Sequence, residues 1–378
     1  MEIKRLKLLD RSFIITLLII LAFGLLVVTS ATSTISSDPY YYLKRQILNI
    51  VLGIGLAVLI VRYDYMNLKR YSLVLYFLSI GLLIWVLIFG NEVRGTTGWI
   101  QLGALPAVQP AEFTKILLIL AFAEFLSSRK GKLNTFGQIL PCLLFMGLPF
   151  GLIMMQPDLG TALVYIAITL IMMFVAGANP RLILYGIALG IFLIALGLIL
   201  HFKFNVPLPL EDYQLKRLTV FVNPYDDGQG GRGAGWNTIQ SLIAIGSGGV
   251  AGKGLFKGTQ VQLNFLPEHH TDFIYAVIGE ELGFLGAVLV IILYGILLFR
   301  AIAISYDAKD LYGTLIVIGI TAMWLFHIYE SIGMSIGLMP ITGIPLPFIS
   351  YGGSSMLTNL AAVGFILSVN IRGKKIVF

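Results

Sequence analysis

Charged residues are scarce in this chain of 378 residues: they make up 12% of it, whereas 57% of the residues are hydrophobic. Soluble globular proteins carry about 25% charged residues, so the composition excludes an ordinary soluble enzyme. A disordered chain is excluded as well, because disorder goes with low hydrophobicity. The apolar runs are continuous and longer than the alternating segments of ~10 residues in a membrane barrel. They therefore predict an all-α, polytopic membrane protein.

Cysteine and the common catalytic motifs are also nearly absent. Cys142 is the single cysteine, which excludes an internal disulfide and a multi-cysteine metal site. The sequence has no phosphate-binding P-loop, no serine-hydrolase motif and no zinc-protease motif, so hydrolysis of a cytoplasmic nucleotide is not expected. The net charge of +7 does not indicate a nucleic-acid partner, because in a membrane protein the distribution of positive charge matters more than its sum.

Ten segments are long and apolar enough to predict spanning helices, which need ~20 residues each. They are Ser12–Ala31, Ile47–Val61, Tyr71–Phe89, Glu112–Leu126, Ile139–Met155, Leu159–Ala176, Leu182–His201, Phe273–Ala303, Leu311–Leu338 and Ser354–Ile371. The first segment resembles a secretory signal peptide, but its apolar core is longer than usual. We therefore expect it to stay as the first span.

The positive charges predict the orientation of these spans. Alternate loops and both chain ends together carry 16 Lys and Arg on one side. The short loops of the other side carry only 3, and a further 6 lie in one long loop, which counts little in this rule. We therefore expect a multi-pass membrane protein with both termini in the cytoplasm.

The long connection, residues 202–271, is then a large extracytoplasmic loop between the seventh and eighth spans, within a single membrane domain of residues 1–378. Apolar residues recur with an approximately helical period over 236–245, which predicts a short helix at the membrane interface. The glycines around it indicate either close approach to a ligand or a mobile loop.

Ionisable residues inside spans are candidates for function, because charge is costly there. Glu112 and Lys115 are three residues apart and share a helix face. They form either a structural pair or part of an outward-facing site for an anionic ligand. Asp272 follows Thr271 at the start of the eighth span. Either this is a capping arrangement, in which Thr271 is the N-cap and the helix dipole favours Asp272 in the first turn, or Asp272 is a functional group. Asp158 after Pro157 has the same two explanations.

Two further patterns concern this end of the long loop. Glu280 lies eight residues after Asp272, on nearly the same helical face, and this spacing predicts a column of acids. His269, His270 and Asp272 have metal-ligand chemistry, but no second cluster lies nearby in the sequence.

Several segments together resemble the SEDS family, whose branches are RodA, FtsW and SpoVE. The resemblance covers essentially the whole chain, and the matching segments are Gly95–Ile100, Gln109–Glu112, Gln156–Thr161, Arg217 with Asn223-Pro224, Gln240–Gly254, Phe265–Ile274 and Pro345–Ser354. Residues 258–265 are most similar to the RodA branch. The chain departs from the family pattern at Gly98, where an arginine is frequent, and at Ala111, where a serine is usual.

The resemblance implies a peptidoglycan glycosyltransferase that polymerises lipid II into glycan strands at the outer face of the bacterial cytoplasmic membrane for cell elongation and rod shape. Its implied partners are a class B penicillin-binding protein and other elongation-complex membrane proteins. Asp272 matches the family's essential acid and is the expected catalytic base. The substrate-binding candidates are Glu112, Lys115, Trp99, Arg217, Lys253, Gln240, Arg94 and Asp158. A divalent cation, Mg²⁺ or Mn²⁺, is expected with the substrate pyrophosphate, and its protein ligands are unknown.

Two other classes of function stay open on the sequence. A transporter of lipid-linked precursor would line a path between both faces with charge, and Glu124 and Glu330 favour it. A membrane scaffold for cell-wall synthases would tolerate the change Asp272→Ala, which a polymerase would not.

Overall fold

The computed structural model describes residues 9–36, 38–93, 96–101, 107–204, 206–207 and 212–373. Its helices are α2 (Arg11–Thr32), α3 (Tyr41–Arg62), α4 (Ser72–Phe89), α5 (Pro110–Ser127), α6 (Phe136–Met154), α7 (Leu159–Val175), α8 (Pro180–Phe204), α9 (Asp212–Val222), α10 (Trp236–Gly248), α11 (Thr259–Gln262), α12 (Ile274–Tyr306), α13 (Leu311–Ser335) and α14 (Gly353–Gly373). A short 3-10 helix, Tyr65–Tyr71, precedes α4.

Each of the ten segments expected to span the membrane coincides with one helix, α2 to α8 and α12 to α14. Eight stretches of the described chain are long and apolar enough to cross a membrane. The remaining two helices are α5, which carries Glu112, Lys115 and Glu124, and α7, which has 17 residues. The all-α membrane class is thus supported, and the count of ten stays a prediction.

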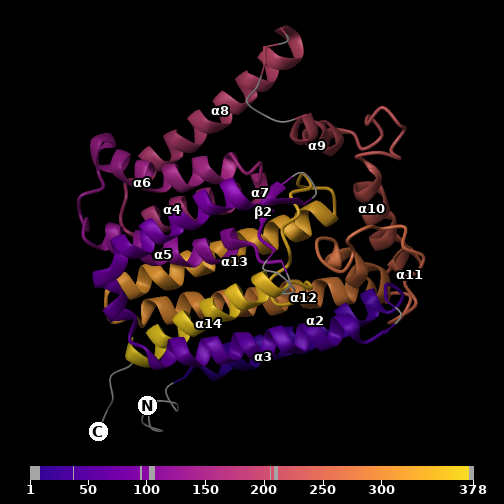
Figure 1. Cartoon of the computed structure of the whole chain (residues 1–378), viewed down its shortest axis with the longest axis horizontal. Coiled ribbons are helices and arrows are strands. Elements are labelled where there is room, and N and C mark those ends of the chain that lie inside the picture. The colour runs from indigo at the N-terminus through magenta and orange to yellow at the C-terminus, as the bar shows by residue number, and fades with distance from the viewer. Residues whose placement is uncertain are drawn as a thin grey trace.

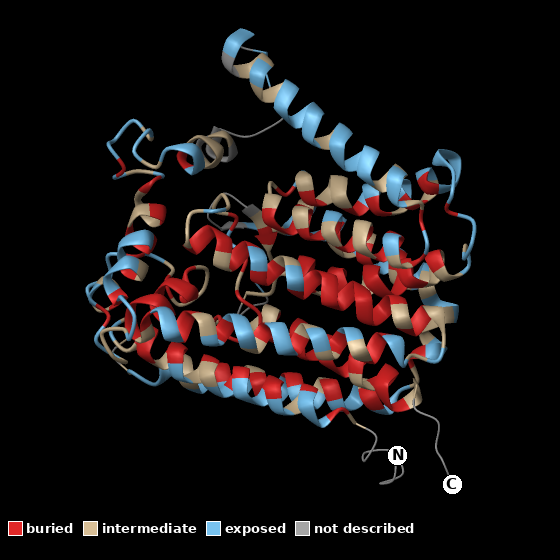
Figure 2. Ribbon diagram, turned by 180° about the vertical axis from the view of Figure 1, so that it is seen from behind, coloured by how far each residue is buried: buried red, intermediate tan, exposed pale blue. Residues whose placement is uncertain are grey.

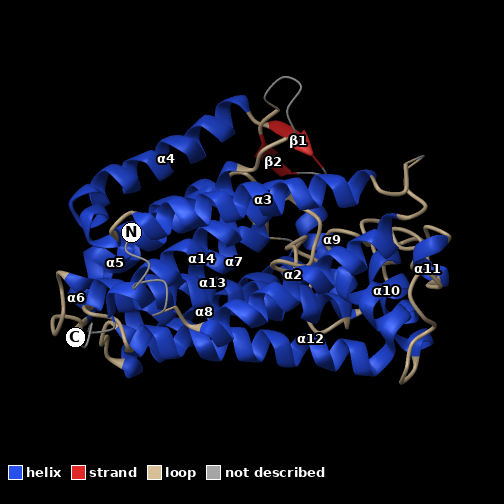
Figure 3. Ribbon diagram, turned by 90° about the horizontal axis from the view of Figure 1, so that it is seen from below, coloured by secondary structure: helices blue, strands red, loops and turns tan. Residues whose placement is uncertain are grey.

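One small sheet lies outside this helical pattern. Strands β1 (Asn91–Val93) and β2 (Thr96–Trp99) pair antiparallel between α4 and α5 in the sequence, beside the end of α4 (Figure 3). The spacing of apolar residues did not predict it, because two strands of three and four residues are too short for a period.

The helices lie side by side in a bundle with α13 at its centre (Figure 1). This helix packs against α5, α7, α12 and α14, and its Trp324 is fully buried. The indole Nε1 of Trp324 donates a hydrogen bond of 2.8 Å to Asn359 of α14. Helix α8 differs from the others, because no residue of its apolar window is buried and it projects from the bundle (Figure 2).

The bundle has two distinct ends. The termini end is where α2 begins, α3 finishes and α14 finishes, tied together by a hydrogen bond from the Asp10 amide to Asn370 and by the Arg300–Asp10 ion pair. The loop end carries the long connection between α8 and α12, which holds α9, α10 and α11. The helix predicted at 236–245 is confirmed as α10.

Helix α12 is broken where one continuous span was expected. Gly283 has φ 65° and ψ −161°, which interrupts the helix. A side chain there would lie 2.3 Å from the backbone nitrogen of Gly252, a distance that excludes any Cβ. The segment after α10 therefore packs directly against the backbone of α12, and only glycine allows the break.

Candidate functional site

Asp272 lies in a turn before α12, not in the helix itself. The helix begins at Ile274, its N-cap is Phe273, and its first turn contains no acid. The expectation that Thr271 caps the helix and that Asp272 stabilises its first turn is therefore wrong. The predicted column of acids fails for the same reason, because it required Asp272 and Glu280 to belong to one helix.

The turn has a defined shape that presents Asp272. The carbonyl oxygen of Glu268 accepts hydrogen bonds of 3.1 to 3.2 Å from the amides of Thr271, Asp272 and Phe273. Glu268 itself has a φ of 53°, which costs free energy for a residue with a side chain. Such strain persists only where the surrounding structure holds it, and it is concentrated at functional sites.

The segment between α13 and α14 holds this turn from the other side. Ser350 donates from Oγ to the carbonyl of Thr271 at 2.5 Å and accepts from the amide of Leu346 at 2.9 Å. The amide of Tyr351 donates to the carbonyl of His270 at 3.0 Å. Gly343 approaches the carboxylate so closely that a Cβ there would lie 3.4 Å from Oδ2 of Asp272.

The starts of α5 and α7 meet at the same end of the bundle. Asp158 caps α7, accepting from the amide of Thr161 at 2.9 Å. This confirms the capping explanation of Asp158. Its Oδ2 also accepts from the side chain of Gln109, which precedes α5, at 3.4 Å. The backbone amide of Gln109 donates to Oγ of Ser354 at 3.1 Å. Three segments far apart in the sequence therefore converge here.

A row of buried ionisable groups links α5 to α13. Nζ of Lys115 lies 2.6 Å from Oε1 of Glu112, which confirms their predicted pairing, and 3.1 Å from Nε2 of His327. One helical turn from His327, Glu330 accepts a 2.9 Å hydrogen bond from Thr342, the neighbour of Gly343. All four ionisable side chains are at most 4% exposed, so the row extends from the surroundings of Asp272 into the bundle.

A pocket of about 510 Å³ opens beside the turn. Trp99, Arg45, Glu268 and Thr271 are among its lining residues, so the structure brings the predicted Trp99 next to the Asp272 turn. Burial raises the pKa of the Tyr351 phenol, which also lines the pocket. Tyr351 therefore stays neutral at physiological pH and can donate a hydrogen bond to a ligand.

The other predicted binding residues lie on the long loop or outside the described residues. Nζ of Lys253 pairs with Oε1 of Glu280 at 2.6 Å. Gln240 is buried in α10 and Arg217 lies on α9. Arg94 falls outside the described residues.

Asp227 shapes the glycine-rich part of this loop. Its carboxylate accepts hydrogen bonds from the amides of Gln229, Gly231, Gly233 and Gly235. These bonds, led by that from Gly231, lower the pKa of Asp227 to about 2. This segment of the loop is therefore ordered around an anion that stays charged at physiological pH.

Sequence reasoning missed two side chains that the fold brings to the site. Neither Arg45 nor His327 was among the predicted site residues. A cation two residues from the predicted second span was a signal for Arg45. No local signal pointed to His327, because its partner Lys115 lies 212 positions away.

The residues that the structure describes do not form a metal site of their own. Within the described ranges, no group of three or more His, Cys, Asp and Glu side chains could hold a metal ion. Both ring nitrogens of His269 lie against backbone carbonyls, those of Leu266 at 2.6 Å and Ala31 at 2.8 Å. Neither nitrogen of His269 is therefore directed at a cation, and the metal interpretation of this histidine receives no support.

The fold and the converging loops define a multi-pass helical membrane protein with a site at one end of the bundle. A family model described as "Cell cycle protein", which covers FtsW, RodA and SpoVE, matches residues 10–375. The chain belongs to this family, the SEDS proteins.

Curated relatives come from three branches of the family. The chain is 39% identical to stage V sporulation protein E of Bacillus subtilis, over 96% of each chain. It is 37% identical to a probable peptidoglycan glycosyltransferase FtsW of Trichlorobacter lovleyi, over 96% of this chain and 93% of the relative. It is 35% identical to peptidoglycan glycosyltransferase RodA of Treponema pallidum, over 96% and 98%.

Solved structures share the fold. The crystal structure of the rod shape determining protein RodA of Thermus thermophilus is similar at 30% identity, with a TM-score of 0.70 and 96% of each chain covered. A chain of a structure described as "Structural coordination of polymerization and crosslinking by a peptidoglycan synthase complex" is similar at 30% identity, with a TM-score of 0.79, over 97% of this chain and 98% of that one.

Proposed function

We propose that this protein is a peptidoglycan glycosyltransferase that polymerises lipid II into glycan strands at the outer face of the bacterial cytoplasmic membrane. The observation that carries the proposal is the convergence of segments 109–112, 156–161, 265–274 and 345–354 at the loop end of the bundle, where Asp272 lies. The relatives named peptidoglycan glycosyltransferase support it.

In this proposal Asp272 is the general base. Its carboxylate would accept the proton of the attacking sugar hydroxyl, which requires an oxygen-to-oxygen distance of about 2.6–3.2 Å. The donor sugar is α-linked and the product β-linked, so one inverting displacement suffices and no covalent enzyme intermediate is needed. The transition state has oxocarbenium character, as in other glycosyl transfers.

Cationic side chains would stabilise the leaving pyrophosphate. Arg45 lines the pocket beside the turn, and an arginine binds phosphate with two parallel hydrogen bonds. Lys115, oriented by Glu112, and Arg217, Lys253 and Arg94 are the further candidates. Gln240 and Trp99 would contact the sugar or the lipid. A divalent cation, Mg²⁺ or Mn²⁺, would arrive on the pyrophosphate, since the described residues build no metal centre.

The proposal includes a location and a partner. The loop end would face outward and the termini end would face the cytoplasm, with ten spans between them. A class B penicillin-binding protein would crosslink the strands, as the structure of a peptidoglycan synthase complex suggests for the related chain. The RodA-like segment 258–265 favours a role in cell elongation and rod shape, alongside other membrane proteins of that complex.

Replacing Asp272 tests the base. Asp272→Asn keeps the size of the side chain and removes the charge, and general-base catalysis contributes about 10²–10⁴-fold. We expect at least a ~100-fold loss of polymerisation when the purified protein, with a transpeptidase-inactive class B partner, receives labelled lipid II and divalent cation. Strand length on a gel is the readout.

The matched control is Asp226→Asn, which changes an exposed acid of the long loop and should leave the rate unchanged. Strand synthesis by Asp272→Asn at the rate of the unmodified protein would contradict the assigned base. If neither protein polymerises although the partner complex forms, the scaffold explanation stays in place.

A further inference from the structure

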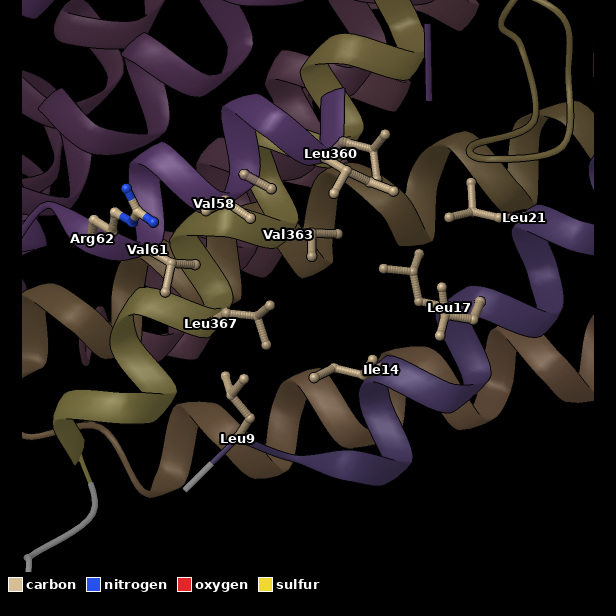
Figure 4. Close-up of a pocket in the computed structure, with 13 residues that line it drawn as sticks. Leu9, Ile14, Leu17, Leu21, Val58, Val61, Arg62, Leu360, Val363 and Leu367 are labelled. Atoms are coloured by element: carbon tan, nitrogen blue, oxygen red, sulfur yellow. The ribbon is translucent and has the colours of Figure 1, made fainter. Parts of the chain in front are cut away.

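An apolar pocket of about 490 Å³ opens between α2, α3 and α14 at the termini end of the bundle (Figure 4). Twelve of its thirteen lining residues are aliphatic, and the thirteenth is Arg62, the last residue of α3. Its volume is within the range of about 300–1,000 Å³ that small-molecule sites have. It lies at the opposite end of the bundle from the Asp272 turn.

The pocket has a buried wall and an open rim. Leu17 on α2 and Leu360 and Val363 on α14 form the wall and are at most 6% exposed. Leu18 on α2 and Val58 on α3 lie at the rim and are 53% and 46% exposed. The pocket therefore opens sideways, toward the surroundings of the bundle. An aliphatic lining offers water no hydrogen-bond partners, whereas it fits a hydrocarbon chain.

The charges around the opening favour an anion. Arg62 is exposed and lines the pocket, and Arg11 begins α2. Asp10 and Asp64, the described acids next to Leu9 and Arg62 in the sequence, already have cationic partners, since Asp10 pairs with Arg300 and Asp64 pairs with Arg372 at 3.2 Å. Among the residues that the structure describes, no acid thus neutralises Arg62, and its positive charge can bind an anionic ligand.

We propose that this pocket binds an anionic phospholipid of the cytoplasmic leaflet, with one acyl chain against Leu17 and Val363 and its phosphate on Arg62. Basic pockets between spanning helices on the cytoplasmic side are suited to such headgroups. The proposal uses the orientation given under the proposed function, in which the termini end is cytoplasmic. It does not require the polymerase activity.

Lipid retention tests the headgroup contact. The full-length protein is exchanged into nanodiscs of phosphatidylcholine containing a minor fraction of phosphatidylglycerol, and retained lipids are counted by native mass spectrometry. Loss of one cation near the membrane surface is expected to reduce the preference for phosphatidylglycerol about fivefold in Arg62→Gln. The control Arg181→Gln removes an exposed arginine at the start of α8 and should keep the preference.

Filling the pocket tests the acyl-chain contact. Val58→Trp places an indole in the opening, and Val51→Trp places the same side chain two turns earlier on the same helix face, outside the pocket. We expect Val58→Trp to lose the retained phosphatidylglycerol and Val51→Trp to keep it, with equal thermal stability of both as the check on folding.

Two results would overturn the proposal. One is equal retention of phosphatidylglycerol by Val58→Trp and the unmodified protein. The other is displacement of phosphatidylglycerol by an equimolar polyprenyl phosphate, which would assign the pocket to an isoprenoid chain. Because Asp272→Asn should retain the phospholipid fully, failure of this proposal is distinguishable from failure of the proposed polymerase.

Discussion

Lys115 illustrates at the level of single residues how a buried charge is held in this protein. Its ammonium has Glu112 on one side and the imidazole of His327 on the other, at 2.6 and 3.1 Å. A neutral imidazole accepts a hydrogen bond through one ring nitrogen. His327 therefore acts as a positioning residue that fixes the direction of the Lys115 side chain.

Replacing His327 tests that role. Hydrogen bonds to charged groups contribute about 1.5–3 kcal/mol, so we expect His327→Leu to lower the polymerisation rate about 10–100-fold. His327→Gln should restore most of the rate, because its side-chain oxygen can accept the same bond. Rates are measured with labelled lipid II. Equal losses in the leucine and glutamine variants would mean that His327 only fills space.

The sequence predicted contacts between near neighbours better than contacts between distant ones. Glu112 with Lys115 and Asp158 with Thr161 are three residues apart, and helix geometry places them together. The position of Asp272 was missed, because a proline-led turn and a helix start look alike in a sequence. His327 reaches its position only through helix packing, which no local pattern encodes, whereas Arg45 had a local signal in its place beside the second span.

At the level of elements, glycines determine how closely α10 can approach α12. A Cβ on Gly248 would lie 2.0 Å from the carbonyl oxygen of Gly279, and one on Gly252 would lie 2.1 Å from that of Glu281. Neither carbonyl can move without distorting the helix. The closeness of α10 to α12 therefore depends on residues without a side chain.

Helix α10 contains two glycines, Gly246 and Gly248, and they allow a matched test. Gly248→Ala should destabilise the protein by about 1–3 kcal/mol, the usual cost of overpacking. Gly246→Ala changes the same helix at a position where a Cβ meets nothing within 4 Å. We expect thermal unfolding in nanodiscs to occur at lower temperature for Gly248→Ala only. The same midpoint for both variants would show that the interface adapts.

Elements were predictable where hydropathy alone determines them. Each expected span became a helix, and so did the stretch at 236–245. The break at Gly283 was not predicted, because it falls inside the expected span Phe273–Ala303 and its cause is the remote segment Val250–Gly252. The pairing of β1 with β2 was not predicted, because the two strands are too short to show a repeating pattern of apolar residues.

For the whole molecule, the orientation is a prediction of its own. The single native cysteine, Cys142, is buried and can be replaced by alanine. Lys130→Cys and Gln229→Cys then introduce exposed thiols at the termini end and in the long loop. In intact cells we expect a membrane-impermeant maleimide to label Gln229→Cys alone.

Permeabilised cells provide the control, since both thiols should then react. Labelling of Lys130→Cys in intact cells would contradict the inward position of the loop after α5. It would also place the phospholipid pocket in the outer leaflet.

Helix α8 connects this molecule to the thickness of the membrane. Its 25 residues extend about 37 Å at 1.5 Å per residue, against a hydrocarbon core of about 30 Å. A helix longer than the core tilts or deforms the bilayer, and neighbouring helices normally limit that tilt. No residue in the apolar window of α8 is buried against the bundle. The tilt of this helix is therefore set by the thickness of the lipid bilayer. A thinner bilayer would therefore displace the start of the long loop while the rest of the bundle stays in place.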